Sequence, residues 1–288
     1  MSFSVRTDLA SEARSFRLSD SASCGFLDGV FCSTGTVDGF FLERLIVDDD
    51  LAAEALCKPK GHYTTLSIDA LLRREENGFE RACRVVSSEL SALLRLKEAD
   101  RVLVVGLGNE AITPDALGPL CAAHTLVTRH LKAQLPDEFA PLRDVAVFCS
   151  GVLGTTGLES AELVRSVVSL CRPDAVIAVD ALCAADPSRL CRTLQLTDAG
   201  IVPGSGVGNA RSALTSDSVG VPVVAVGMPT VVDAASLCPD RSCSSPGLIV
   251  TPRDIDARVA DAARLIGYSI DLALHPALTL ADIDMLLS

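Results

Sequence analysis

The sequence predicts an α/β fold: a three-layer α/β/α sandwich with a mostly parallel central sheet and an antiparallel addition at its N-terminal end. Hydrophobic residues make up 49% of the 288 residues but aromatic residues only 4%, so the core is built mainly from Ala, Val, Leu and Ile. After residue 101, short and continuous apolar runs alternate with amphipathic segments. Continuous apolar runs are typical of parallel strands that are covered by helices on both faces.

The first 75 residues are irregular in pattern. Residues 39–47 and 63–69 are rich in β-branched and aromatic residues, so each predicts a strand, and together they predict an antiparallel addition. Residues 79–94 carry apolar side chains at helical spacing, with charged residues on the opposite face, and predict an amphipathic helix.

The remainder of the chain has the pattern of the sandwich itself. Strands are expected at 102–105, 145–148, 175–179 and 221–226, with helices near 119–132 and 158–170 and an edge strand at 193–197. A last helix is expected to start with Thr251 as its N-cap and Pro252 in its first turn. We expect a single domain over 1–288, in which 1–75 is the addition and 76–288 the α/β core.

Charge and hydropathy exclude several classes of protein. The net charge is −12, which argues against nucleic acid or an anionic membrane surface as the main partner. No apolar run reaches about 18 residues, and the first residues do not have the pattern of a signal peptide. The 11 cysteines have no zinc-site spacing and are typical of buried thiols in a reducing compartment. We therefore expect a cytoplasmic protein.

Ligands of open α/β sheets bind beyond the carboxyl ends of the strands, so the segments after the strands are the candidate site. The sequence has no phosphate-binding P-loop motif. A dinucleotide-binding motif begins correctly at Gly106 and Gly108 but has Ala111 in the third glycine position. The residues flanking Ser205 do not form the Gly-x-Ser-x-Gly motif of a serine nucleophile.

Carboxylates remain as candidates. Asp115 follows the first strand of the core, close to a helix start that favours its ionised form, and Asp180 follows the third strand. Two carboxyl groups at neighbouring strand ends repel each other when both are ionised, so one keeps a proton and the pair can supply a base and an acid. Each of the two residues could instead be a cap or turn residue, and Asp233 is a rival with the same description.

Long strings of the sequence, in order, resemble the germination proteases of spore-forming bacteria. They are Ser4–Ala10, Val105–Asn109, Thr113–Pro119, Leu126–His130, Gly154–Glu159, Val176–Ala181, Pro203–Asn209, Met228–Ala234, Val250–Asp256 and Leu274–Pro276. The resemblance implies an endopeptidase that degrades small acid-soluble spore proteins during germination in the spore core. It also implies a fold similar to that of hydrogenase maturation endopeptidases, a homotetramer, and a zymogen that trims itself.

The resemblance further implies that Asp115 and Asp180 are the catalytic residues of an atypical aspartic peptidase, with no cofactor. The maturation enzymes hold a metal with two acids and a His, but none of the four histidines has a matching position, and we expect metal-free chemistry. The backbone N–H groups of Gly106–Gly108 or Gly204–Gly206 are candidates for oxyanion binding. Asp8–Ala10 resembles a substrate site and is either a self-recognition segment or an N-terminal anchor. A non-catalytic binding relative and a metal-dependent maturation-type peptidase remain the alternatives.

Overall fold

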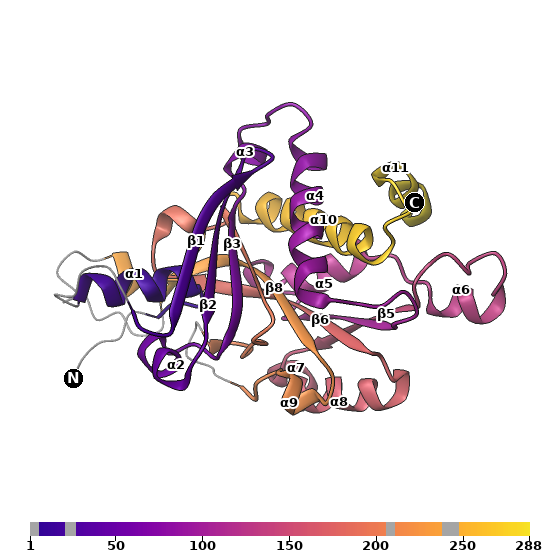
Figure 1. Ribbon diagram of the computed structural model, residues 1–288, viewed down its shortest axis with the longest axis horizontal. Coiled ribbons are helices and arrows are strands. Elements are labelled where there is room, and N and C mark those ends of the chain that lie inside the picture. Colours follow the sequence, from indigo (N-terminus) through magenta and orange to yellow (C-terminus); the bar gives the residue numbers. More distant parts are fainter. Residues whose placement is uncertain (1–5, 21–26, 206–210, 238–247) are drawn as a thin grey trace.

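The fold is known from a computed structural model that describes residues 6–20, 27–205, 211–237 and 248–288. Within these residues, one sheet joins nine strands in the order β1-β2-β3-β7-β8-β6-β4-β5, with β9 paired to β8 (Figure 1). The strands are β1 Val30–Val37, β2 Phe40–Val47, β3 Gly61–Ser67, β4 Val102–Leu107, β5 Val145–Gly151, β6 Ala175–Ala184, β7 Thr193–Thr197, β8 Val223–Asp233 and β9 Ile249–Val250.

The four strands β5, β4, β6 and β8 form the parallel part of the sheet. Every residue of β4 and all but one of β6 are buried or nearly so, which explains their continuous apolar runs. The predicted strands are confirmed, but β6 and β8 each extend several residues further than their apolar runs. The two strands remain paired as far as Ala184 and Val232, across a register shift after Leu182.

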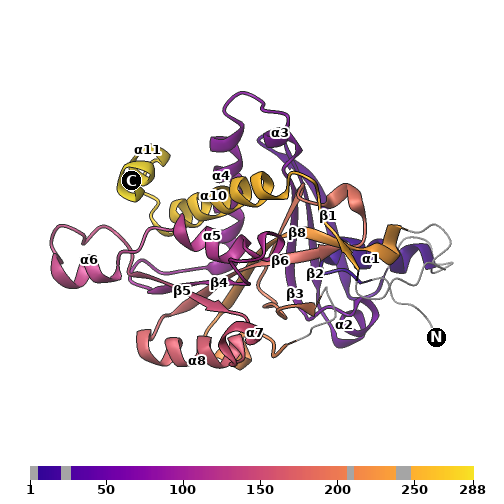
Figure 2. The same ribbon diagram turned by 180° about the vertical axis from the view of Figure 1, so that it is seen from behind.

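Helices cover both faces of this parallel part (Figures 1 and 2). Apolar side chains of α4, α5 and α10 pack on one face, and those of α8 and α9 pack on the other. The three-layer sandwich is therefore confirmed. The helices are α1 Ala10–Asp20, α2 Asp50–Leu56, α3 Asp69–Leu72, α4 Gly78–Leu94, α5 Leu117–Ala123, α6 Arg129–Gln134, α7 Leu153–Thr156, α8 Ser160–Cys171, α9 Ser216–Val219, α10 Ile255–Leu274 and α11 Leu280–Leu287.

The N-terminal addition is antiparallel, as predicted, and it continues the main sheet. Strand β3 pairs with β7, and β7 pairs with β8, both in antiparallel register. The prediction that 193–197 is an edge strand is therefore wrong, because the addition covers the edge that β7 would otherwise expose. All five residues of β7 are buried, which its alternating pattern does not suggest.

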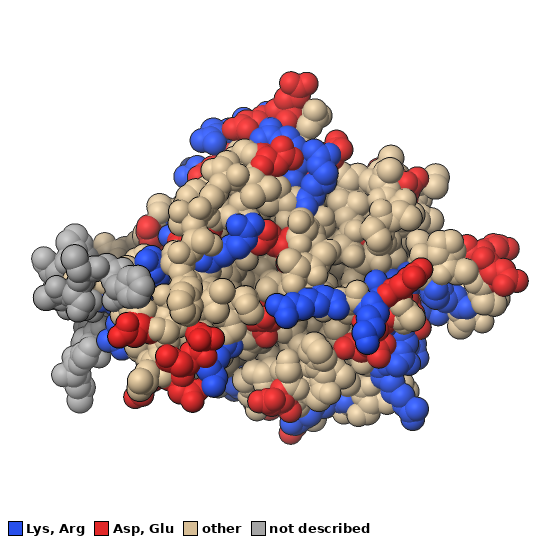
Figure 3. All heavy atoms as spheres, viewed as in Figure 1, with Lys and Arg blue, Asp and Glu red and all other residues tan. Residues whose placement is uncertain are grey.

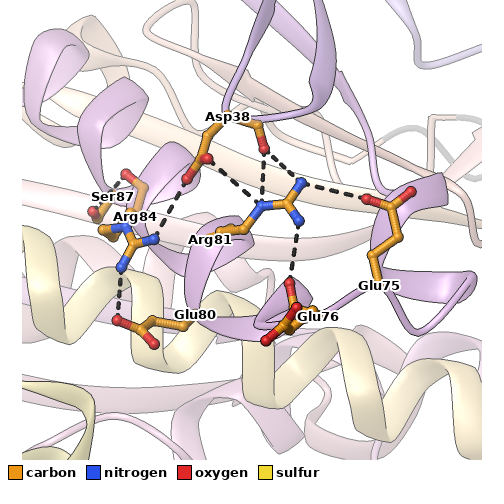
Figure 4. Close-up of polar contacts among 7 residues, drawn as sticks. All are labelled: Asp38, Glu75, Glu76, Glu80, Arg81, Arg84 and Ser87. Carbon is orange, nitrogen blue, oxygen red and sulfur yellow. Dashed lines mark hydrogen bonds and ion pairs between the residues drawn. The ribbon is translucent and has the colours of Figure 1, made fainter.

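The turn between β1 and β2 is fastened to α4 by arginines (Figure 4). Arg81 donates from Nε and Nη2 to the Asp38 carbonyl oxygen, at 3.1 and 2.8 Å. Arg84 reaches the Asp38 carboxylate at 3.5 Å and pairs with Glu80 one helical turn away. Because α4 packs on the parallel strands, these contacts tie the tip of the addition to the core.

Two helix predictions need correction. The helix expected near 119–132 is divided into α5 and α6, because the Leu126 N–H donates to the buried Asp271 carboxylate instead of continuing a helix. The last helix begins at Ile255 and not after Thr251, whose hydroxyl donates to the Thr230 carbonyl oxygen at 2.8 Å. The apolar residues Ile255, Val259, Ala262, Ile266 and Ile270 of this helix are buried.

Acidic and basic side chains are intermingled on the face shown in Figure 3. In the part of the chain that the structure describes, no helix has both the length and the apolar character needed to cross a membrane.

Candidate active site

A cavity of about 520 Å³ lies at the carboxyl ends of the parallel strands. Its walls include the segment after β4, the start of α7, the second half of β6, the end of β8, and Arg6 and Asp8 near the N-terminus. Both predicted aspartates, Asp115 and Asp180, line it. The structure thus brings together the two carboxyl groups that the sequence singles out, in the region where α/β sheets bind ligands.

The segment after β4 folds back closely over the strand because two positions have no side chain. A Cβ atom on Gly118 would lie 2.2 Å from the Leu107 carbonyl oxygen. A Cβ atom on Gly108, whose φ is +109°, would lie 2.1 Å from the Asp115 carbonyl oxygen. Only glycine fits such separations. The resulting turn of 3-10 helix, η1 Thr113–Asp115, places Asp115 in the cavity wall.

Hydrogen bonds fix the position of this turn. The Asn109 N–H donates to Asp115 Oδ2 at 2.9 Å and to the Asp115 carbonyl oxygen at 3.0 Å. The Thr230 hydroxyl of β8 donates to the Pro114 carbonyl oxygen at 2.7 Å. The Asp115 carboxyl group is therefore held in one orientation by the backbone of its own turn and by the neighbouring strand.

Asp180 lies inside β6, opposite Gly227 of β8, with only 4% of its surface exposed. The expectation that Asp180 follows the end of its strand is therefore wrong. Asp180 nevertheless lies just beyond the end of the neighbouring strand, because β4 pairs with β6 only as far as Gly106 and Val179. Oδ1 of Asp180 accepts a hydrogen bond from the Ala181 N–H at 2.9 Å.

Burial raises the pKa of both carboxyl groups. The pKa of Asp115 rises to about 6 because burial outweighs the hydrogen bond from Asn109. The pKa of Asp180 rises well above its ordinary value, first because of burial and then because of the charge on Asp115. The negative charge of Asp115 therefore favours the protonated form of Asp180.

The predicted position of Asp115 close to a helix start is confirmed, but the pKa of its carboxyl group is raised and not lowered. Asp115 lies in the three-residue turn η1, before the start of α5, and burial dominates any stabilisation of its charge by a helix end. A partly buried carboxylate with a pKa near neutrality is suited to accept a proton, and a protonated neighbour is suited to donate one.

The rival carboxylate Asp233 also lines the cavity. Its Oδ1 accepts from the Ala235 N–H at 2.9 Å, as a turn residue does. Of the glycines considered for oxyanion binding, Gly108 and Gly204 line the cavity, while Gly206 lies outside the described residues.

The donor set does not fit a transition-metal site of the maturation type. His62, His124, His130 and His275 all lie in the described part of the chain, and the cavity lining includes none of them. The described residues also contain no group of three or more His, Cys, Asp or Glu side chains arranged to hold a metal ion. Two carboxylates without a third donor make a poor site for such a metal.

One cavity residue had no predicted place in the site. Asp8, near the N-terminus, lines the same cavity as Asp115 and Asp180 although it lies more than 100 residues away in sequence. Leu9 and Ala10 beside it are completely buried, which supports the interpretation of this segment as an anchor. In the sequence, the position of the charged Asp8 next to the apolar residues Leu9 and Ala10 was the only local sign of its place in the site.

A family model and individual proteins of known sequence point to the same family. Residues 8–243 match the family model described as germination protease. The chain is 38% identical over 322 residues to the germination protease of Caldanaerobacter subterraneus subsp. tengcongensis, with 98% of each chain covered. It is 35% identical over 323 residues to that of Clostridium acetobutylicum, again with 98% of each covered.

Among solved structures, the chain is similar to a NiFe hydrogenase maturation protease, HycI, from Thermococcus kodakarensis KOD1. The TM-score is 0.37 at 21% identity, over 63% of this chain and 98% of that chain. The family match covers most of the chain, and full-length relatives share more than a third of their residues with it. The chain therefore belongs to the germination protease family, whose members are peptidases of spore germination.

Proposed function

We propose that this protein is an endopeptidase that degrades small acid-soluble spore proteins during germination, with Asp115 and Asp180 as its catalytic residues. The observation that carries the mechanism is that the half-buried Asp115 and the buried Asp180 line one cavity, just beyond the end of β4. Membership of the germination protease family supports this choice of substrate. In this proposal the whole chain acts as one peptidase domain, because the addition and the core share one sheet.

In the first step, ionised Asp115 takes a proton from a water molecule as the water oxygen attacks the scissile carbonyl carbon. Protonated Asp180 donates its proton to the carbonyl oxygen, which gives a neutral tetrahedral diol. In this proposal an N–H group of Gly108 or Gly204, both of which line the cavity, steadies this oxygen while charge develops on it.

In the second step, the proton held by Asp115 passes to the departing amide nitrogen as the carbon–nitrogen bond breaks. Asp180 takes back a proton from the diol as the new carboxyl group forms. Both aspartates then have their starting protonation states. Because the two groups interact, a change of charge at one of them also moves the pH dependence that the other one sets.

The test is cleavage of a small acid-soluble spore protein by the purified protein, with and without a chelator. We expect discrete peptide products at the same rate in both samples. A complete lack of products would favour the alternative of a non-catalytic binding relative. Loss of cleavage in chelator, with recovery on addition of a divalent metal, would favour the metal-dependent alternative.

The family membership also leads us to propose a zymogen, a homotetramer and a location in the spore core. The zymogen proposal is tested by mass spectrometry of the full chain during incubation, and the tetramer proposal by sedimentation. A chain that stays unprocessed and active, or a monomer at micromolar concentration, would contradict the respective proposal.

A further inference from the structure

The N-terminal segment, defined here as residues 6–9, is built into the wall of the candidate active site. The Asp8 N–H donates to the Cys183 carbonyl oxygen at 2.9 Å, and the Cys183 N–H donates to Asp8 Oδ2 at 2.8 Å. Cys183 lies three residues beyond Asp180 on the same strand, β6. The segment is therefore fastened to the strand that carries Asp180, close to that carboxyl group.

Further contacts hold the N-terminal segment from both sides. The Lys58 Nζ donates to the Thr7 carbonyl oxygen at 2.9 Å. The buried Glu12 carboxylate accepts from the N–H groups of Ala185 and Asp186, at 2.7 and 3.0 Å. Leu9 is completely buried. Asp8 is thus a fixed group of the native fold.

The second oxygen of Asp8 is also satisfied, since Oδ1 accepts from the Ser205 hydroxyl at 2.6 Å. Both partners of Asp8 are neutral donors, so its negative charge is oriented but not cancelled by them. A carboxylate held this way in a cavity wall acts on other groups in the cavity through a low dielectric.

The charges around Asp180 come from two elements. Asp115 approaches from η1 and Asp8 from the N-terminal segment, and both favour the protonated form of Asp180. The other charged residues of the cavity wall are Arg6, Glu159, Arg211 and Asp233. Asp8 itself is attracted by Lys58, whose pKa burial lowers, and its charge contributes to the raised pKa of the Cys183 thiol.

We propose that Asp8 is a positioning residue of this site: its carboxylate, fixed by Cys183 and Ser205 in the wall of the cavity that Asp180 also lines, helps the Asp180 carboxyl group to keep the proton that it donates. The inference rests on the proposed two-aspartate function. It gives the N-terminal segment a part in the chemistry, because the negative charge of Asp8 acts on Asp180 although the two residues are far apart in the sequence.

The test uses Asp8→Asn, which keeps the shape of the side chain. The amide oxygen can still accept from the Cys183 N–H, and the amide nitrogen can donate to the Ser205 oxygen, so the anchor is retained while the charge is removed. Without that charge Asp180 loses its proton at lower pH. We expect the alkaline limb of the kcat/KM profile to move down by roughly 0.5–1 pH unit, with activity at acidic pH within about twofold of wild type.

Asp233→Asn is the matched control, because it removes the same charge from the same cavity. Asp233 is not among the charges that act on Asp180, and Asn keeps its acceptor for the Ala235 N–H. We expect its alkaline limb to stay where it is in the wild type. An unchanged limb in Asp8→Asn, or an equal shift in Asp233→Asn, would overturn the inference.

A titration that does not depend on activity separates this inference from the proposed function. Carbon NMR of labelled aspartate side chains, with the Asp180 signal assigned through Asp180→Asn, reports the protonation of Asp180 directly. A lower Asp180 pKa in Asp8→Asn supports the inference even if the wild type cleaves no substrate. An unchanged Asp180 pKa contradicts it even if the wild type is a peptidase.

Discussion

Asp115→Asn should make the protein more stable at alkaline pH while it removes the proposed base. The pKa of Asp115 is about 6 in the folded state against an ordinary value of 3.8. A difference of about two pKa units corresponds to about 3 kcal/mol. The free energy of unfolding falls by this amount when the group has to ionise in the folded protein. Because the carboxyl group is only partly buried, solvent screening reduces the expected effect to about 1.5 kcal/mol.

The sign follows from proton binding. Between pH 3.8 and about 6 the folded state binds a proton that the unfolded state has lost, so stability falls as pH rises through this range. Asparagine cannot ionise, and its amide oxygen still accepts the hydrogen bond from Asn109. The gain in the variant should be below about 0.5 kcal/mol at pH 4 and should reach its full value above about pH 7.

The measurement is the free energy of urea unfolding of both proteins from about pH 4 to about pH 8. In thermal unfolding, the gain in stability at the alkaline end corresponds to a rise of about 3–6 °C in Tm. Asp137→Asn is the control, since it removes the same charge from an exposed position. A variant that is no more stable than wild type at alkaline pH, or a gain that is equal at both ends, would show that the carboxyl group is not desolvated.

Three further predictions concern the same scaffold. Gly118→Ala should lower the free energy of unfolding by roughly 2–4 kcal/mol, because its Cβ atom would lie 2.2 Å from the Leu107 carbonyl oxygen. In the same thermal unfolding experiment, the control Gly154→Ala should be nearly neutral, because the space around Gly154 is open. Asp271→Asn should stabilise the protein more at pH 8 than at pH 5, since burial raises the pKa of Asp271 to about 7; equal effects at the two pH values in denaturant unfolding would contradict this. The acid limb of the kcat/KM profile should have its midpoint near pH 6, the pKa of Asp115, and a midpoint near pH 4 would mean that another group is the base.

The parallel core could be predicted because its signal is local. A strand buried on both faces has to be apolar throughout, and β4 and β6 show this directly in the sequence. The position of β7 could not be predicted in this way. Its neighbours β3 and β8 come from distant parts of the chain, and only their pairing makes β7 an internal strand.

The candidate site, like the fold, could be predicted only where its signal is local. Asp115 and Asp180 follow or interrupt apolar runs, so they stood out as charged groups at strand ends. The degree of burial of Asp180 could not be predicted, because it depends on β6 continuing beside β8 after β4 has ended. Asp8 is held in the cavity wall by hydrogen bonds to residues far away in sequence, such as Cys183 and Ser205, which no local pattern encodes.

The central claim is that Asp115 and Asp180 together perform the hydrolysis. Its most direct test is the rate of cleavage of a small acid-soluble spore protein by Asp115→Asn and Asp180→Asn, with Asp233→Asn measured beside them. We predict that each of the first two variants is folded and slower than wild type by a factor of about 10³ or more, while Asp233→Asn cleaves at a rate close to that of wild type. Near wild-type cleavage by either Asp115→Asn or Asp180→Asn would contradict the two-aspartate mechanism.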